Sequence, residues 1–194
     1  GTSIQGRPLN MVKISDNPES DEAEPEMRVD ALHHAREPQG MQCTLWFMLF
    51  LLEEYGNDPL ADFLVNEREI YFVPCVNPDG YEYNRQTNPG GGGMWRKNRR
   101  NNGGGVYGVD LNRNYPARNF LPGKTYGMRP LDQPEAKALH DLVRSERPHL
   151  VIVAHSWRND HFINFDGPAV KLAELFADRS GYRVKPSDRI SPTP

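Results

Sequence analysis

Hydrophobic residues recur along the chain at the spacings expected of strands and helices. Residues 10–14 alternate in polarity, residues 27–32 form a strand-like run, and residues 69–76 are rich in β-branched and aromatic side chains. The apolar run 150–154 and the short run 162–165 have the same character. Runs of this length and composition are typical of strands. The pattern therefore predicts strands distributed over most of the chain.

Helical spacing occupies the intervals between several of these strands. The predicted helices span 39–55, 59–66, 132–147 and 168–179. The first ends before Gly56, and Gly181 follows the last, as is common at helix C-termini. Asp132 and Glu135 have the spacing of a capping box at the start of the third helix. The alternation of strand and helix predicts a single-domain α/β fold, with a doubly wound, mixed sheet flanked by helices.

The segment 77–130 shows little periodicity. It opens on Asn77-Pro78-Asp79-Gly80, a strong turn signal, and includes glycine-rich runs. Unstructured segments of this length inside a compact domain are usually functional or disordered. The embedded motifs Trp95–Arg100 and Val109–Asn114 favour a functional segment.

Composition is that of an ordinary globular protein. The 194 residues can bury one sizeable core, and 37% hydrophobic and 25% charged residues are typical of a soluble chain. The net charge of −3 shows no basic excess, so neither nucleic acid nor an anionic membrane is an expected partner. The apolar run 45–52 is far shorter than the roughly 20 residues of a membrane-spanning helix. The first residues contain neither an initiator methionine nor an apolar signal core, so the compartment is unknown.

His34 and Glu37 follow the second predicted strand, and Pro38 prevents that strand from continuing. A hydrolytic zinc site takes three protein ligands, often two imidazoles and a carboxylate, and leaves one position to water. His155, at the end of the fourth predicted strand, is the best candidate for the third ligand. In open α/β sheets ligand sites lie at the carboxyl ends of strands, which is where we expect both histidines.

Other histidines compete with this set on sequence grounds alone. A lone His-x-x-Glu pair occurs by chance in many chains. His33 is adjacent to His34 but has no carboxylate three residues further on. His140 and His149 fall on or beside a predicted surface helix, where a solvated imidazole is expected. His161 remains open as a substrate-side group.

Five motifs occur in the order, and at close to the spacing, of the zinc carboxypeptidase family typified by carboxypeptidase A. They are His34-Ala35-Arg36-Glu37, Asn77-Pro78-Asp79-Gly80-Tyr81, Trp95-Arg96-Lys97-Asn98-Arg99, Asp110-Leu111-Asn112-Arg113-Asn114 and Ala154-His155-Ser156. The chain resembles this family from about Gly6 to its last residues. The resemblance implies a zinc metallocarboxypeptidase, a hydrolase that removes the C-terminal amino acid of peptides or proteins with metal-activated water.

The family's metal ligands match this sequence residue by residue. The resemblance implies one Zn²⁺ ion held by His34, Glu37 and His155, which would lower the pKa of water and polarise the scissile carbonyl. It also implies that Asp110 accepts a hydrogen bond from the outer nitrogen of His34 and thereby fixes the tautomer of the ring.

Three polar residues of the long segment resemble the family's substrate-binding groups. Arg96 matches the arginine that stabilises the oxyanion, and Asn112 with Arg113 match the pair that binds the substrate's terminal carboxylate. This carboxylate site would make the enzyme an exopeptidase. The three other basic residues of the 95–100 motif are expected on the surface, either solvated or in ion pairs.

The family's glutamate general base and substrate-facing tyrosine lie well beyond the third zinc ligand, and we expect neither within this chain. Residues 1–194 are therefore expected to form a zinc carboxypeptidase-like catalytic domain that lacks its C-terminal part. Residues 164–169 resemble bacterial members of the wider group and leave open a murein-peptide amidase or a deacylase. A noncatalytic zinc- or peptide-binding module is the third alternative. The sequence does not reveal side-chain preference or oligomeric state.

Overall fold

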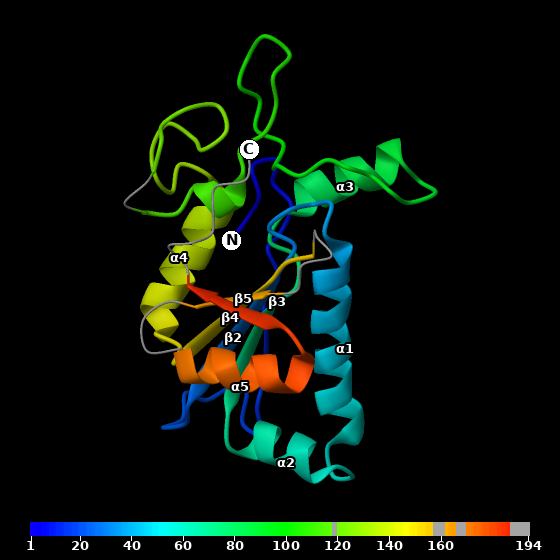
Figure 1. Ribbon diagram of the computed structural model, residues 1–194, viewed down its shortest axis with the longest axis vertical. Helices are drawn as coiled ribbons and strands as arrows, with labels where there is room; N and C mark the ends of the chain where they lie inside the picture. The colour runs from blue at the N-terminus through cyan, green and yellow to red at the C-terminus, as the bar shows by residue number, and fades with distance from the viewer. Residues whose placement is uncertain (118–119, 157–161, 166–169, 187–194) are drawn as a thin grey trace. The chain divides into compact units, whose positions relative to one another are not determined.

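A four-stranded mixed sheet forms the centre of residues 1–156 in the computed structural model of the chain (Figure 1). Its strands, in spatial order, are β1 (Val12–Ile14), β3 (Glu69–Val73), β2 (Glu26–Ala31) and β4 (Leu150–Ala154). Strand β2 runs parallel to both β3 and β4, whereas β1 is antiparallel to β3. The predicted mixed sheet is confirmed.

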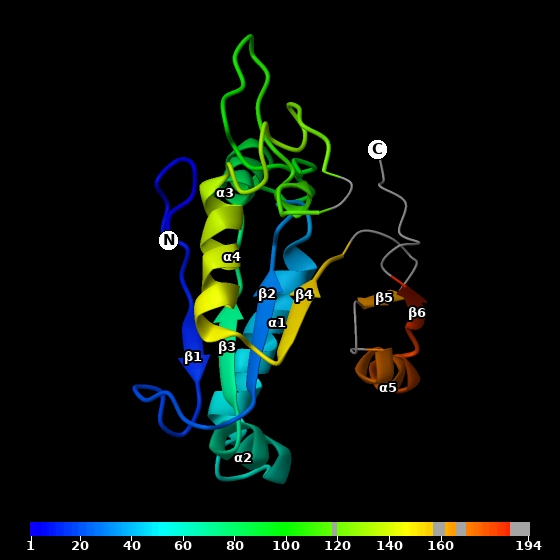
Figure 2. The same cartoon turned by 90° about the vertical axis from the view of Figure 1, so that its left-hand side faces the viewer.

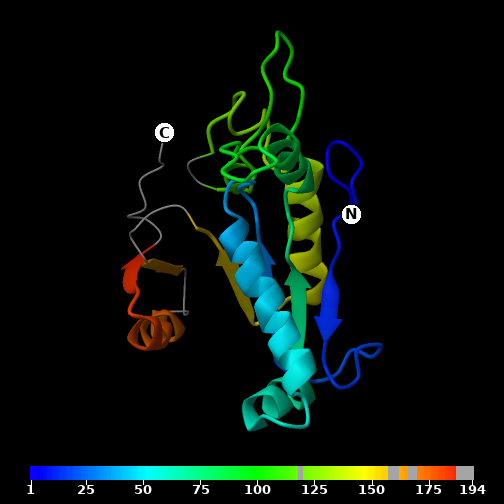
Figure 3. The same cartoon turned by 90° about the vertical axis from the view of Figure 1, so that its right-hand side faces the viewer.

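Helices cover both faces of this sheet (Figures 2 and 3). They are α1 (Pro38–Glu54), α2 (Pro59–Asn66), α3 (Pro78–Thr87), the short 3₁₀ helix η1 (Leu111–Arg113) and α4 (Pro134–Glu146). Helices α1 and α4 lie on opposite faces. Each of the helices α1 to α4 begins with proline, whose fixed φ and missing N–H suit the first turn. The predicted α/β class is therefore confirmed.

Two hydrophobic clusters fill the spaces beneath α1 and α4. Ile70 and Phe72 of β3 pack with Leu51 of α1, and all three side chains are fully buried. Val73, one residue further along β3, packs with Leu139 of α4 on the opposite face. This alternation follows from the two-residue period of a strand, and burial on both faces is typical of parallel sheets.

The carboxyl ends of β2 and β4 lie side by side. Their register pairs Ala31 with Ala154, so the residues that follow the two strands emerge at the same edge of the sheet. Leu32 then adopts a left-handed backbone conformation, with φ of 59°, although its side chain is fully buried. This change of direction ends the strand immediately before His33 and His34.

Two local predictions at helix starts are wrong. The predicted turn at Asn77 is instead the N-terminus of α3, where its side chain accepts a hydrogen bond from the N–H of Gly80 at 3.0 Å. The same residue types form turns and cap helices, which explains the error. The predicted capping box of Asp132 and Glu135 is also wrong, because Gln133 is the N-cap and its side chain makes no capping bond.

The chain divides into two compact units, residues 1–156 and 157–194, and the structure describes residues 1–117, 120–156, 162–165 and 170–186. In the second unit β5 (Phe162–Phe165) pairs in parallel with β6 (Arg183–Pro186), and α5 (Val170–Ser180) lies between them in sequence. Helix α5 was predicted, although its first two predicted residues lie outside the described ones, and β6 was not predicted. No helix in the described ranges is both long and apolar enough to cross a membrane.

Candidate metal centre

His34 and Glu37 meet in a tight turn directly after β2. The N–H of Glu37 donates to the carbonyl of His34 at 3.0 Å, and this turn brings the two side chains together. Nδ1 of His34 lies 2.8 Å from Oε1 of Glu37, and both side chains are almost fully buried. Asn77 supports the turn from α3, because its Nδ2 donates to the carbonyl of His33 at 3.2 Å.

His155 joins this pair from the end of β4. Its Nδ1 lies 2.9 Å from Oε2 of Glu37, and its ring centroid is 4.8 Å from that of His34. Ligand atoms of His34, Glu37 and His155 all lie within 4.8 Å of one another. The side chain of His155 is 33% exposed, whereas the other two are buried, so the cluster is accessible at His155. The structure thus brings the three predicted ligands together.

Asp110 determines which nitrogen of His34 faces the cluster. Its Oδ1 lies 3.2 Å from Nε2 of His34, which favours a proton on Nε2 and leaves a lone pair on Nδ1. Two imidazole nitrogens and a carboxylate oxygen are the donors of a hydrolytic zinc site. The tautomer that Asp110 favours is the one that binds a cation through Nδ1. The chemistry of the residues present therefore fits a zinc ion.

Negative charge is concentrated on the two buried carboxylates of the centre. Burial alone would raise the pKa of Glu37, but hydrogen bonds with His155 and His34 lower it to about 2. Burial also opposes ionisation of Asp110, yet contacts with His34 and Arg96 hold its pKa well below the usual range. Both carboxylates are ionised at neutral pH, which favours binding of a cation.

The Arg96 guanidinium borders the centre. Its Nε donates to Oδ2 of Asp110 at 2.9 Å, and its Nη1 lies 3.7 Å from Oε1 of Glu37. The carbonyl of Arg96 accepts a hydrogen bond from the N–H of Ala35 at 3.0 Å, so its loop is joined to the turn that carries the ligands. A permanent positive charge therefore lies beside the candidate ligands, as the sequence analysis expects.

Asn112 and Arg113 lie in η1, of which Asp110 is the N-cap. Oδ1 of Asp110 accepts a hydrogen bond from the N–H of Asn112 at 3.0 Å, and the same oxygen faces His34. Arg113 is partly exposed, and its Nη1 donates to the carbonyl of Asn112 at 3.1 Å. Asp110 thus links the predicted carboxylate-binding residues to a predicted metal ligand.

His33 makes contacts that differ from those of His34. Its Nε2 lies 2.9 Å from the hydroxyl oxygen of Tyr115, and its buried ring lies beside that of His155, with centroids 5.8 Å apart. This pair was not predicted from the sequence. Its one sequence signal is the position of Tyr115, directly after the 110–114 motif. His33 therefore packs against the ligand cluster and is not a member of it.

Arg99 departs from the expectation of a solvated or ion-paired surface residue. Its guanidinium carbon lies 3.7 Å from the ring centroid of Tyr83, 4.4 Å from that of Trp95 and 4.8 Å from that of Tyr107. Cation–π contacts of this kind are favourable when the cation is partly desolvated. The three rings come from different segments, so the sequence alone could not reveal that they surround one arginine.

The other described histidines lie apart from the cluster. Nδ1 of His140 is 3.5 Å from a carboxylate oxygen of Asp141, and Nδ1 of His149 accepts a backbone hydrogen bond. His161 lies outside the described residues. So do residues 166–169, which contribute to the resemblance behind the amidase and deacylase alternative.

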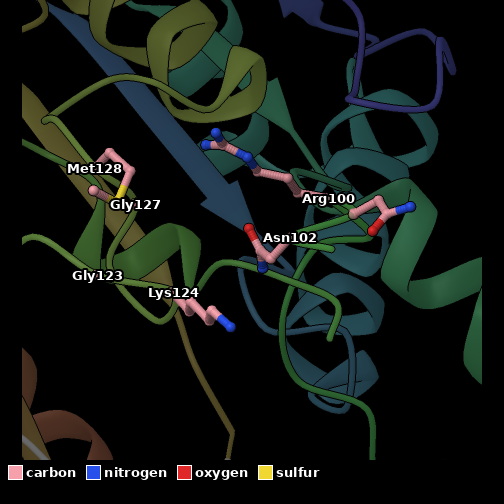
Figure 4. Close-up of a pocket in the computed structure, with 7 residues that line it drawn as sticks. Arg100, Asn102, Gly123, Lys124, Gly127 and Met128 are labelled. Atoms are coloured by element: carbon pink, nitrogen blue, oxygen red, sulfur yellow. The ribbon is translucent and has the colours of Figure 1, made fainter. Parts of the chain in front are cut away.

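A separate cavity of about 280 Å³ lies among the loops of the long segment (Figure 4). It is lined by Arg100, Asn101, Asn102, Gly123, Lys124, Gly127 and Met128. None of these residues is a candidate ligand or a predicted substrate-binding group. The candidate centre is therefore defined by its converging side chains and not by this cavity.

Comparisons with known proteins show the family to which the chain belongs. The family model described as zinc carboxypeptidase matches residues 1–170. Carboxypeptidase A2 of Rattus norvegicus is 31% identical over 211 residues, covering 96% of this chain and 49% of the rat protein. A zinc carboxypeptidase of Saccharothrix mutabilis subsp. capreolus is 44% identical over 115 residues, covering 59% of this chain and 26% of that protein.

Fold similarity extends over nearly the whole chain. The solved structure of thrombin activatable fibrinolysis inhibitor matches with a TM-score of 0.80 and 26% identity, over 97% of this chain and 52% of that one. The chain thus spans about half the length of the rat protein and of this solved structure. Sequence and fold agree, and the chain belongs to the zinc carboxypeptidase family.

Proposed function

We propose that the whole protein is a zinc-dependent metallocarboxypeptidase, which hydrolyses the C-terminal peptide bond of peptides or proteins. Residues 1–194 belong to its catalytic domain. The observation that carries the proposal is the position of the Asp110 carboxylate, which contacts His34, the Arg96 guanidinium and the N–H of Asn112. One side chain thereby joins a metal ligand to two loops that carry arginine.

His34, Glu37 and His155 would hold the zinc ion. When bound, zinc supplies Lewis-acid chemistry, because it polarises a carbonyl group and lowers the pKa of water. Asp110 holds the proton of His34 on Nε2 and so keeps Nδ1 available as a ligand atom. The partial exposure of His155 gives a peptide access to this side of the cluster.

Arg96 would stabilise the negative charge that develops on the substrate's carbonyl oxygen. Its guanidinium is a permanently charged group. Asp110 holds Nε at 2.9 Å, while Nη1 lies 3.7 Å from Glu37, beside the metal ligands. Because the donor is fixed before the reaction begins, little reorganisation is needed as the charge appears.

Arg113 and Asn112 would bind the terminal carboxylate of the substrate. A planar guanidinium holds a carboxylate through two parallel hydrogen bonds. A peptide bond in the middle of a chain has no such carboxylate beside it. Recognition of this group therefore restricts cleavage to the end of the substrate.

Kinetics of the full-length, zinc-loaded protein test the proposal. Arg113→Ala should lower kcat/KM roughly 10- to 100-fold for peptides with a free terminal carboxylate, since hydrogen bonds to charged groups contribute about 1.5 to 3 kcal/mol. Peptides with an amidated C-terminus should lose far less. Arg144→Ala, in the exposed last turn of α4, is the matched control and should leave kcat/KM unchanged for both kinds of peptide. Equal losses on the two substrates would remove Arg113 from the carboxylate site.

A comparison of murein peptides with ordinary peptides also separates the two alternatives to a carboxypeptidase. Hydrolysis of murein peptides in preference to ordinary peptides would favour the amidase reading. A protein that binds zinc and peptide but releases no amino acid would be the noncatalytic module. Stepwise release of C-terminal amino acids from ordinary peptides supports the carboxypeptidase.

A further inference from the structure

The two arginines of the proposed site lie on separate loops. Arg96 belongs to the loop 95–100, and Arg113 belongs to the turn 110–114. A substrate that is cleaved must contact both at once. Their separation therefore decides whether a bound peptide is correctly placed, and a misplacement of about 1 Å can cost roughly 10²-fold in rate.

Asp132, two residues before α4, binds both loops with its carboxylate. Oδ2 accepts a hydrogen bond from Nη1 of Arg100 at 2.9 Å, at the end of the Arg96 loop. Oδ1 accepts one from Nδ2 of Asn114 at 2.8 Å, directly after Arg113. The two oxygens of one side chain thus connect the segments that carry the two arginines.

Gln133, the N-cap of α4, makes a second pair of links between the same loops. Its Oε1 accepts from Nδ2 of Asn98 at 2.9 Å, and its N–H donates to Oδ1 of Asn114 at 3.0 Å. Its Nε2 donates to Oδ1 of Asp132 at 2.7 Å. This hydrogen bond joins the links made by Gln133 to those made by Asp132. Gln133, Asn98 and Asn114 are fully buried.

The buried network is consistent only with a narrow set of loop positions. Each amide has donors and acceptors that must all find partners, and a buried polar group without one costs about 1 to 3 kcal/mol. Asn98 also exchanges two hydrogen bonds with Val109, which precedes the carboxylate that contacts Arg96. A shift of either loop would therefore break several buried hydrogen bonds together.

We infer that Asp132 and Gln133 are positioning residues that hold Arg96 and Arg113 at the separation a C-terminal substrate requires. The inference rests on the proposed function. Within the described residues, the hydrogen bonds of both go to the loops, to each other and to neighbouring backbone, and not to the candidate metal ligands. Their loss should therefore affect substrate placement and leave zinc binding intact.

The test compares two variants of the full-length, zinc-loaded protein. Asp132→Asn, which keeps the shape but weakens the contacts with both loops, should lower kcat/KM for free-carboxylate peptides about 10- to 100-fold. It should also reduce the ratio of kcat/KM between free and amidated peptides at least fivefold, with zinc content unchanged. Arg100→Met removes only the link from Asp132 to the Arg96 loop, so it should lower kcat and preserve that ratio. Arg100 is 32% exposed, so this variant is informative even where Asp132→Asn does not fold.

A stability control separates positioning from a merely structural role. Leu139→Ala removes a buried side chain of α4 and should lower stability without changing the ratio between free and amidated peptides. The inference is overturned if Asp132→Asn keeps both kcat/KM and the ratio within twofold of the parent, or if Leu139→Ala changes the ratio equally. An unmodified protein that releases no amino acid would instead overturn the proposed function.

Discussion

His34 and Asp110 contact each other across 76 positions of sequence, with Nε2 of the imidazole 3.2 Å from Oδ1 of the carboxylate. The contact orients the ring so that Nδ1 faces Glu37, 2.8 Å away. The other oxygen of Asp110 accepts a hydrogen bond from Arg96 at 2.9 Å. A single carboxylate therefore sets the orientation of a candidate metal ligand and of the neighbouring guanidinium.

Asp110→Asn should weaken zinc binding by about 10- to 100-fold, the range found when a partner of a metal-bound imidazole is lost. The amide is neutral and no longer favours a proton on Nε2 of His34. Zinc affinity measured by competition with a chelator checks this. Asp141→Asn, an exposed carboxylate of α4, is the control and should change nothing. An unchanged affinity in Asp110→Asn would show that His34 is oriented by other contacts.

At position 32 the glycine variant should be more stable than the alanine variant, which is the reverse of the usual order. Leu32 is fully buried at φ of 59°, a conformation that costs a side-chain-bearing residue roughly 1 to 2 kcal/mol. Both Leu32→Ala and Leu32→Gly lose burial worth about 2 to 5 kcal/mol. Glycine also removes the backbone strain, so Leu32→Gly should be the more stable variant by roughly 0.5 to 1 kcal/mol.

Leu51 provides the matched comparison for Leu32. It is equally buried but lies within α1, where glycine is about 1 kcal/mol less favourable than alanine. Leu51→Gly should therefore be less stable than Leu51→Ala in denaturant titrations. The same order of alanine and glycine at both positions would argue against the left-handed conformation of Leu32.

Asp132 should make stability depend on pH in the acid range. Burial would raise its pKa, but hydrogen bonds from Gln133, the N–H of Met128, Arg100 and Asn114 lower it from 3.8 to about 2. Because the folded pKa is depressed, the stabilisation is complete above the unfolded value and is lost as pH falls from about 4 to about 2. The loss should be on the order of 2 kcal/mol. In denaturant titrations, the free energy of unfolding of Asp132→Asn should depend less steeply on pH in the acid range than that of the parent. Parallel pH curves for the two proteins would contradict the assignment of this dependence to Asp132.

Tyr115→Phe should destabilise the protein by about 1 to 3 kcal/mol, because it leaves Nε2 of the buried His33 without its partner. Tyr55→Phe also removes a hydrogen bond, to Asn66, but that one is exposed to solvent and its loss should cost less than about 1 kcal/mol. Denaturant titrations compare the two. Equal losses of stability in the two variants would mean that water readily replaces the hydrogen bond between His33 and Tyr115.

The sequence predicts the three candidate ligands because their residue types and their positions at strand ends point to the same site. His34 and His155 each follow a predicted strand, and parallel neighbours bring their ends to one edge of the sheet. The partners of Asp132 and Arg99 were not predictable in this way. Asp132 has the spacing of a capping box, yet its carboxylate binds residues far from α4 in sequence. Such contacts depend on how the loops cross in space, which local patterns do not encode.

Helix α3 shows a second limit of the sequence pattern. Its residues are largely polar, so no apolar stripe marks it as a helix, and its first residues equally suit a turn. Its position is set by buried contacts, such as those of Asn84, whose Nδ2 donates to the carbonyls of Ala35 and Trp95 at 3.1 and 2.9 Å. Tertiary hydrogen bonds therefore compensate for weak local propensity.

The metal content of the purified full-length protein tests the proposed zinc site most directly. It is measured by elemental mass spectrometry beside the release of C-terminal amino acids. We predict one zinc ion per chain, bound by His34, Glu37 and His155, and stepwise release from peptides with a free carboxylate. Glu37→Ala and His155→Ala should lose both the zinc and the activity. A protein that binds no zinc with all three residues intact, or that retains zinc in both variants, would contradict the proposed zinc site.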